Sequence, residues 1–466
     1  MKHLLASLLA ASVVVPASLG QTAELLTTYT TSQLTATAGV FGIPSELYTP
    51  EFDVNMYRVT YDMPFLGDTV AVSGALFVPQ GFDESCGLPV HVYMHGTVFK
   101  RTDAPSYQSV EGTFGGLMAT LGQLVLMPDY VGLGSSELMH PYVHARSEAD
   151  AGYFMMVTAD ALGDELGYDL NGQNFISGYS QGGHAAMALA RDLATTSWAE
   201  DFTLTAAVPG SGPYDISGTQ FPQTFDFASY SNPAYLAYNV IGWNSVYGTL
   251  YTDLSEVFQE PYASTILPMF DGTYSGEAIN AVCPATLEEF VQPGLVEAIL
   301  ADPTHPFVVA AQDNDVYQWV PEVPVDMQYC TLDEQVFYQN ALVAEDWMVA
   351  NGSTTATATN LGAYDHGGCA GLAIFGGTLW IDGMVEACVD GLGEAGRPAL
   401  RTSPNPADAT LRLEGLDAGT TWTVRTATGQ VLMHGTGATL DVSTWRAGLY
   451  LITADDGRTV RVQVAR

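Results

Sequence analysis

The sequence contains very few basic residues. Its 466 residues include 14 Lys and Arg against 51 Asp and Glu, and only Lys2 and Lys100 are lysines. Such an acidic surface repels the phosphate backbone of nucleic acids, so we expect no nucleic-acid partner. The carboxylates instead favour solubility in salty surroundings, where dissolved ions screen their mutual repulsion.

Long apolar runs are also rare. One lies near the start, where Lys2 precedes an apolar stretch and small residues lead up to Gln21. This pattern predicts a secretory signal peptide at residues 1–20 and therefore an exported protein. No later stretch is long and apolar enough to span a bilayer, so we expect no integral membrane segment.

Cysteine is scarce as well, with five in the whole chain. In an exported protein this number predicts up to two disulfides and one unpaired thiol. We expect the pairs Cys369–Cys388 and Cys283–Cys330, which leaves Cys86. The sequence does not fix this connectivity.

The composition changes abruptly towards the end of the chain. Eight of the 14 basic residues lie from Arg397 onward, together with only six acidic ones. This asymmetry predicts a domain boundary at about 392–403. Short alternating runs broken by glycine turns follow, and they predict a small antiparallel β-sandwich.

Several motifs of this last segment occur in a fixed order: "SPNPADATLRL", "TATGQVL" and "LDVSTWRAGLYLITA". With these motifs, residues 403–466 resemble the C-terminal sorting domain of the type IX secretion system. The resemblance implies export through the periplasm, with type IX secretion machinery carrying the protein across the outer membrane to the cell surface or the medium. An accessory β-domain that binds carbohydrate is the alternative.

Between Asp53 and Cys388, buried strands alternate with helical segments. This rhythm predicts an α/β fold with a largely parallel sheet after an antiparallel start. The rhythm stops at about 221–318, a stretch dense in Phe, Tyr and Trp. A hundred residues without strands predict an inserted helical cap better than a loop.

The stretch "NFISGYSQGGHAAMALA" places Ser180 between an apolar strand and a helix of small residues. A Gly-x-Ser-x-Gly pentad is weak on its own in a glycine-rich chain, but the flanking strand and helix predict a nucleophile elbow. A serine nucleophile needs a base, a carboxylate that orients the base, and donors for the oxyanion.

Four histidines follow Ser180 in the chain. His184 lies on the helix that the serine begins, His305 precedes the best acid, and His434 lies in the C-terminal segment. His366, after the last predicted strand of the α/β region, is therefore the predicted base.

The predicted acid is Asp333, just beyond the strand "PVDMQYCT". A carboxylate there can reach across to the loop after the next strand. The alternatives that stay open are Asp313, Asp315, Glu334 and Asp365.

The oxyanion donors are predicted to be the backbone amides of Gln181 and Thr97. Thr97 follows Gly96 in "YMHGTVFK", where His95 is expected to brace the loop. Asp129 and Tyr130, at the end of the following strand, are either the floor of the site or purely structural.

Taken together, the segment from about 50 to 390 resembles the α/β-hydrolase serine esterases, nearest the secretory lipase group. The resemblance rests on His95-Gly96-Thr97, Pro128-Asp129-Tyr130, Gly178-Tyr179-Ser180-Gln181-Gly182-Gly183, Asp333-Glu334-Gln335-Val336 and Asp365-His366-Gly367. It implies a catalytic domain at 21–395 that hydrolyses small-molecule or lipid carboxylic esters without a metal or an organic cofactor. A peptidase of the same fold and a surface-displayed binding protein with a vestigial triad are the alternatives.

Overall fold

The computed structural model describes residues 21–386 and 400–464, apart from short gaps at 46–47, 84–85, 227–229, 406, 417–418, 427–430, 447 and 456–458. The predicted signal peptide at 1–20, Cys388 and most of the predicted boundary at 392–403 lie outside the described residues.

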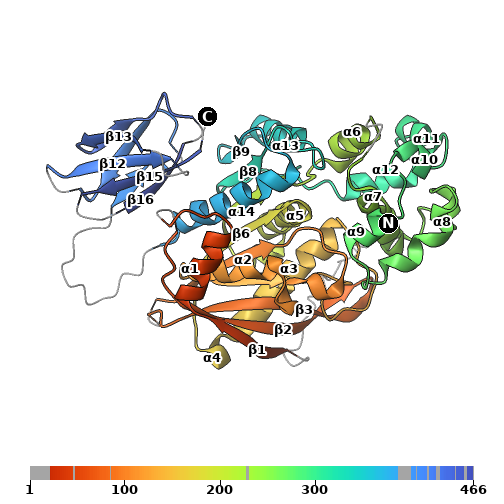
Figure 1. Ribbon diagram of the computed structural model, residues 1–466, viewed down its shortest axis with the longest axis horizontal. Helices are drawn as coiled ribbons and strands as arrows, with labels where there is room; N and C mark the ends of the chain where they lie inside the picture. Colours follow the sequence, from red (N-terminus) through yellow and green to blue (C-terminus); the bar gives the residue numbers. More distant parts are fainter. Residues whose placement is uncertain are drawn as a thin grey trace, which may run out of the picture.

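A nine-stranded sheet forms the body of the molecule, in the order β1-β2-β3-β5-β4-β6-β7-β8-β9 (Figure 1). The pairs along β1-β2-β3-β5 are antiparallel, and every neighbouring pair from β5 to β9 is parallel. This arrangement confirms the predicted mostly parallel α/β sheet with an antiparallel start. The strands β1 to β9 span Thr22–Tyr29, Asp53–Phe65, Asp68–Gln80, Leu88–Met94, Leu124–Pro128, Leu170–Tyr179, Leu204–Gly210, Val325–Tyr329 and Ala356–Asn360.

The first strand and the helix after it were not expected from the sequence. Strand β1 has no clear alternation of buried and exposed positions, and Leu25 is exposed. Pairing with β2 at the sheet edge therefore holds it in place. Helix α1 (Thr31–Val40) begins at a capping box in which the Thr30 side chain accepts from the Gln33 amide. This Thr-x-x-Gln pattern is a local signal for a helix start.

Helices cover both faces of the sheet (Figure 1). Helices α3 (Ala145–Ala161), α5 (Gln181–Thr195) and α13 (Gln339–Ala350) share the largest apolar core with the strands. Helices α1, α2 (Val110–Ala119) and α14 (His366–Asp382) pack in a second core on the other face. None of the helices in the described part of the chain is long and apolar enough to cross a membrane.

A helical segment lies between β7 and β8, at one end of the sheet (green, Figure 1). It has an apolar core of its own, which includes Trp243, Phe258 and Phe290. We call this segment the cap. It comprises a short π-helix at Ile216–Gln220 and helices α6 to α12 at Phe221–Asp226, Pro233–Tyr247, Tyr262–Thr265, Gly276–Asn280, Leu287–Phe290, Leu295–Ala301 and Pro306–Asp313.

The C-terminal region forms two small antiparallel sheets (blue, Figure 1). Leu411 and Leu440 from one sheet share a buried core with Trp422 and Ile452 from the other, so the sheets pack face to face as the predicted sandwich. The three-stranded sheet contains β10 (Arg401–Ser403), β11 (Thr410–Glu414) and β14 (Thr439–Asp441). The four-stranded sheet contains β13 (Val431–Thr436), β12 (Thr421–Thr426), β15 (Gly448–Ala454) and β16 (Thr459–Val464).

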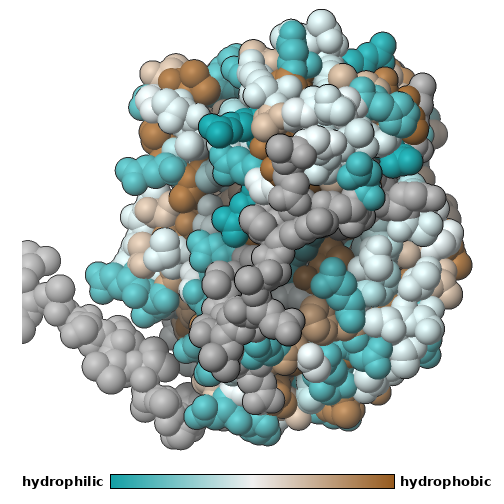
Figure 2. All heavy atoms as spheres, turned by 90° about the vertical axis from the view of Figure 1, so that its left-hand side faces the viewer, coloured by the Kyte–Doolittle hydropathy of each residue, from teal (hydrophilic) through white to brown (hydrophobic). Residues whose placement is uncertain are grey.

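Hydrophilic and hydrophobic residues are mixed on the surface. On the face shown in Figure 2, hydrophobic residues are interspersed with hydrophilic ones. Single exposed apolar side chains of this kind are usual on folded proteins and need no binding partner to explain them.

Candidate active site

Ser180 lies at a strained turn between β6 and α5. Its φ of 62° and ψ of −120° are a conformation that L-residues rarely adopt. The turn is possible because glycines flank it. A Cβ atom on Gly178 would lie 2.1 Å from the carbonyl oxygen of Gly182, and one on Gly182 would lie 1.9 Å from that of Met94. The close backbone approach that exposes the serine therefore requires glycine at both positions.

Ser180, His366 and Asp333 form a chain of hydrogen bonds. The Nε2 atom of His366 is 2.9 Å from Ser180 Oγ, and its Nδ1 atom is 2.7 Å from Asp333 Oδ2. Because Asp333 accepts at Nδ1, the imidazole carries its proton there and leaves Nε2 free to accept the serine proton. This geometry is the one that activates a serine hydroxyl for nucleophilic attack.

The loop after β8 holds Asp333 in place. Asp333 is buried, and its Oδ1 accepts from the backbone amides of Gln335 and Val336 at 3.0 and 2.9 Å. These two donors stabilise the negative charge of the carboxylate and fix its direction. The carboxylate is therefore oriented before any substrate binds.

Two hydrogen bonds hold the backbone of His366, the first residue of α14. The Tyr179 hydroxyl donates to its carbonyl oxygen at 2.7 Å, and its amide donates to Glu334 Oε2 at 3.1 Å. Burial raises the pKa of Glu334, but hydrogen bonds from the His366 amide and the Gln335 side chain outweigh this and lower the pKa below its usual value. Glu334 thus stays ionised and positions the histidine backbone, while Asp365 caps α14 by accepting from the Gly368 amide at 2.7 Å.

A disulfide ties the acid loop to the histidine helix. It joins Cys330, three residues before Asp333, to Cys369, three residues after His366. The predicted pairs Cys369–Cys388 and Cys283–Cys330 are therefore wrong, because folding brings the end of β8 against the first turn of α14. Cys283, which was expected to be paired, is a free thiol, and Cys86, which was expected to be unpaired, is disulfide-bonded.

The other acids and histidines considered from the sequence have partners elsewhere. Asp313 accepts from the Tyr247 hydroxyl at 2.7 Å, and Asp315 accepts from the amide of Ser217 at 3.0 Å. The ring of His305 accepts from the Phe307 amide at the start of α12, and that of His434 contacts the Thr423 hydroxyl in the C-terminal sandwich. Each of these four side chains therefore has a hydrogen-bond partner away from Ser180.

The first oxyanion candidate, Gln181, is the first residue of α5. Its backbone N–H has no partner within the helix, because the first four amides of an α-helix lack intrahelical acceptors. It lies directly after the nucleophile, at the positive end of the helix dipole.

The second candidate, Thr97, lies in the loop after β4. Gly96, which precedes it, is close to the elbow, because a Cβ atom there would lie 3.5 Å from the carbonyl oxygen of Tyr179. The Thr97 hydroxyl lies 2.9 Å from the hydroxyl of Tyr142. This loop is thus next to the serine, and it is linked to Tyr142, whose ring stacks on Tyr238 of the cap.

His95 is buried behind this loop. Its Nδ1 atom is 2.7 Å from the carbonyl oxygen of Gly96, its ring stacks on Tyr130, and the Tyr130 hydroxyl donates to its carbonyl oxygen at 3.0 Å. Burial lowers the pKa of His95 to about 4, so the ring is neutral at pH 7. His95 and Tyr130 together brace the loop.

Asp129 is fully buried beside them. Its carboxylate accepts from the Ser73 hydroxyl at 2.6 Å and from the Ser106 amide at 2.9 Å. Burial raises its pKa, although these hydrogen bonds partly oppose the shift. Asp129 thus joins β3, β5 and the loop before α2.

A buried polar network behind the elbow was not foreseen from the sequence. Glu148 on α3 accepts from Gln181 Nε2 at 2.8 Å and contacts His184 Nδ1 at 2.7 Å. The other ring nitrogen of His184 lies 2.9 Å from the carbonyl oxygen of Asn314, and Gln181 Nε2 also lies 2.8 Å from His140 Nε2. No local signal marks Glu148 in the sequence, because its partners come from distant segments.

The protonation of His140 fits this network. Burial lowers the pKa of His140 to about 3, so its ring is neutral. Its Nδ1 donates to the carbonyl oxygen of Val131 at 2.7 Å, which leaves Nε2 to accept from Gln181. The network therefore fixes the side chain of the residue whose backbone amide is the first oxyanion candidate.

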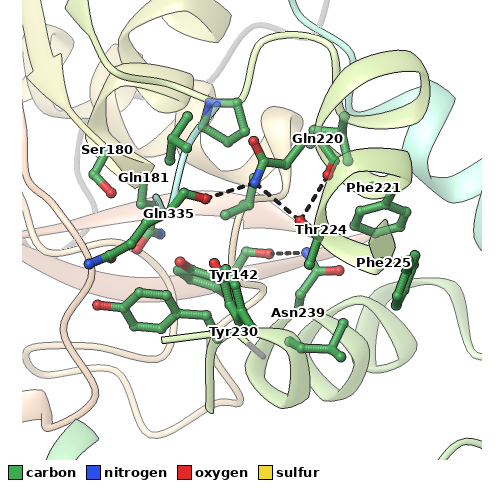
Figure 3. Close-up of a pocket in the computed structure, with 16 residues that line it drawn as sticks. Tyr142, Ser180, Gln181, Gln220, Phe221, Thr224, Phe225, Tyr230, Asn239 and Gln335 are labelled. Carbon is green, nitrogen blue, oxygen red and sulfur yellow. Dashed lines mark hydrogen bonds between the residues drawn. The ribbon is translucent and has the colours of Figure 1, made fainter. Parts of the chain in front are cut away.

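A cavity of about 80 Å³ opens beside Ser180 and extends under the cap (Figure 3). Its described lining includes no charged residue. The wall consists of Tyr142, Val143, Ser180, Gln181, Pro213, Ile216, Gln220, Phe221, Thr224, Phe225, Tyr230, Tyr235, Leu236, Asn239, Gln335 and Val336. The cavity therefore suits a neutral, largely apolar group next to the serine.

The described residues contain no cluster of three or more His, Cys, Asp and Glu side chains that could hold a metal ion. The Ser-His-Asp chemistry described above needs none, because the histidine supplies the base and backbone amides can supply the oxyanion donors.

No protein-family model matches the chain, and no curated protein matches it by sequence. Among solved structures, it is similar to LipA, a rice cell wall degrading esterase from Xanthomonas oryzae. The identity is 27% over 76% of this chain and 93% of that chain, with a TM-score of 0.67. A ligand-bound form of LipA gives 26% identity, 78% and 95% coverage, and a TM-score of 0.68.

Candida antarctica lipase A shares the fold at 15% identity, over 74% of this chain and 77% of that chain, with a TM-score of 0.53. These solved structures are esterases and lipases of the α/β-hydrolase fold. The similarity therefore supports an ester hydrolase of the α/β-hydrolase fold.

We predict that Glu148→Leu lowers the free energy of unfolding by about 3–5 kcal/mol, because it leaves buried partners unpaired. Glu148→Gln should cost less, since a neutral His184 can accept from the new amide while Gln181 keeps its acceptor. Denaturant unfolding measures both variants, with Glu165→Leu at an exposed position of α4 (Gly163–Leu166) as the control. Equal losses at positions 148 and 165 would contradict the prediction.

Proposed function

We propose that the protein is a secreted serine hydrolase that cleaves carboxylic esters through an acyl-enzyme intermediate. The observation that carries the proposal is the hydrogen-bonded chain from Asp333 through His366 to Ser180 at a strained elbow. The similarity to the esterase LipA supports an ester as the substrate.

In the first step, Ser180 Oγ attacks the ester carbonyl carbon while His366 Nε2 accepts the hydroxyl proton. The imidazolium that forms is stabilised by Asp333, which already accepts from Nδ1. The backbone amides of Gln181 and Thr97 donate to the oxyanion of the tetrahedral intermediate.

In the second step, the C–O bond breaks and His366 returns the proton to the leaving alcohol. Water then attacks the acyl-enzyme with His366 again as the base, which releases the acid and restores Ser180. No metal or organic cofactor takes part in this proposal.

The neutral cavity favours an ester over a peptide. A peptidase that reads a chain end needs a charged anchor for the terminal amine or carboxylate, and no described residue of the cavity lining is charged. A vestigial site has no need of the full set of contacts that hold His366 and Asp333. Both observations support the esterase proposal over its alternatives.

We also propose that the C-terminal sandwich at 403–466 is a type IX sorting domain, which follows the catalytic domain at 21–395. The proposal rests on the sequence motifs of this segment and on its sandwich fold. The disulfides at Cys330–Cys369 and at Cys86 are compatible with export, because such bonds form in oxidising compartments.

Loss of the triad should abolish ester hydrolysis. We expect Ser180→Ala and His366→Ala to lower kcat by roughly 10⁴–10⁶, and Asp333→Asn to lower it less. A fluorophosphonate probe should label the wild type but not Ser180→Ala, and p-nitrophenyl acetate hydrolysis gives kcat. Asp365→Asn, a helix-cap carboxylate next to the histidine, is the matched control. Folded wild-type protein that the probe fails to label would end the proposal.

The acyl-chain length should depend on Leu236. With Phe221 and Phe225, it lines both the cavity beside Ser180 and a second cavity in the cap whose described lining is wholly apolar. Leu236→Ala should join the two, and each further methylene that becomes buried should raise kcat/KM by about fourfold. p-Nitrophenyl esters of two to sixteen carbons measure the profile.

Leu295→Ala is the control for this experiment, because Leu295 lines only the second cavity. It enlarges that cavity without opening it towards Ser180. If the chain-length profile shifts equally in both variants, Leu236 does not separate the two cavities.

The sorting proposal predicts where the enzyme accumulates. In a host with type IX secretion, removal of residues 397–466 should leave the esterase in the periplasm, because the machinery no longer recognises it. Activity in periplasmic and extracellular fractions measures this against the full-length chain. Extracellular activity at the full-length level would refute the proposal.

A further inference from the structure

The cavity beside Ser180 contains a buried hydrogen-bond acceptor that has no donor. Asn239 on α7 lines this cavity and is 8% exposed, and its Oδ1 atom is fully buried without a partner. Its Nδ2 atom faces the carbonyl oxygen of Tyr142 at 3.5 Å, which places the nitrogen on that side and the oxygen on the other. Buried polar atoms without partners are rare in folded proteins, and leaving one unpaired is costly.

Two other buried amides of the same cavity, those of Gln220 and Gln181, are in a different position. Gln220 Oε1 accepts from the Phe337 amide and from Asn340 Nδ2, so it is satisfied within the protein. Gln181 Oε1 also has no donor, but it belongs to the residue next to Ser180, where the reacting ester group sits. Asn239 Oδ1 is thus the unpaired acceptor of the cavity wall that lies away from the ester.

The position of Asn239 indicates which part of the substrate it meets. Figure 3 shows Ser180 and Gln181 on one side of the cavity, and Asn239 and Phe225 on the opposite side. His366, which must reach the leaving alcohol, is not among the described lining residues. The cavity therefore takes the acyl group, whose far end lies near Asn239.

The walls favour a ring over a flexible chain. Tyr142, Tyr230 and Tyr235 line the space together with Phe221 and Phe225. Aromatic side chains bind a planar ring through stacked or edge-to-face contacts that add to simple burial. Because no described lining residue is charged, the group that donates to Asn239 is neutral.

We propose that the cavity binds an aromatic acyl group that carries a phenolic hydroxyl at its far end, with that O–H donating to Asn239 Oδ1. This inference rests on the proposed esterase function and adds the class of acid to it. A site with a buried acceptor discriminates strongly against an analogue that lacks the donor, because the acceptor is then left unpaired.

The test compares esters that differ only in the hydroxyl. The pairs are methyl 4-hydroxyphenylacetate and phenylacetate, methyl 3-(4-hydroxyphenyl)propanoate and 3-phenylpropanoate, and methyl 4-hydroxycinnamate and cinnamate. In the wild type we expect the hydroxylated ester to have at least about tenfold higher kcat/KM in one or more pairs. A wild type that never prefers the hydroxylated ester overturns the inference.

Two substitutions, each close in shape to the residue it replaces, test whether Asn239 causes the hydroxyl preference. Asn239→Leu removes the acceptor and should abolish or reverse the preference, measured as the ratio of the two kcat/KM values in each pair. Thr224→Val lines the same cavity but removes a hydroxyl that already donates to the Gln220 carbonyl oxygen, so the preference should remain. A preference that survives in Asn239→Leu, or disappears equally in both variants, overturns the inference.

The failure of this inference and that of the esterase proposal are distinguishable. If the wild type cleaves p-nitrophenyl acetate and reacts with the fluorophosphonate probe but shows no hydroxyl preference, only the acyl-group assignment is wrong. If it cleaves no ester and the probe does not label it, both are wrong.

Discussion

The whole site depends on one steric constraint, the close packing of backbone against backbone at the turn between β6 and α5. Carbonyl oxygens of Gly182 and Met94 lie where side chains would otherwise begin. This packing drives Ser180 into a positive-φ conformation, which the Ser180 amide supports by donating to the Gly210 carbonyl oxygen at 3.0 Å. The strain is tolerated because the turn lies between β6 and α5, which are both buried. The turn places the Ser180 hydroxyl at the carboxyl end of the central strands.

The partners of the serine converge because parallel strands end at the same edge. Asp333 follows β8 and His366 follows β9, and these neighbouring strands run in one direction. Backbone amides hold the acid, whereas the Tyr179 hydroxyl and the Glu334 carboxylate hold the histidine backbone. With the Cys330–Cys369 disulfide, the geometry of the site is set before a substrate arrives, which is what efficient catalysis requires.

In the proposed function, the cap determines which acyl group the site accepts. It encloses a neutral aromatic cavity, and three residues on α6 and α7 separate that cavity from a second, apolar one. The reacting atoms come from the sheet and the surroundings of the acyl group come mainly from the insertion. The proposal therefore assigns chemistry and substrate preference to different parts of the chain, which is common where a fold hosts many activities.

The sequence predicted the alternation of strands and helices, and it placed Ser180, Asp333 and His366 each just after a strand, because these features depend on periodicity or on position relative to a strand. It did not reveal β1, whose register is set by pairing with β2, nor the disulfide pairing, which depends on how β8 meets α14. Glu148, His140 and Asn239 are equally invisible in the sequence. Their roles arise from contacts between segments far apart along the chain, and only tertiary packing brings those segments together.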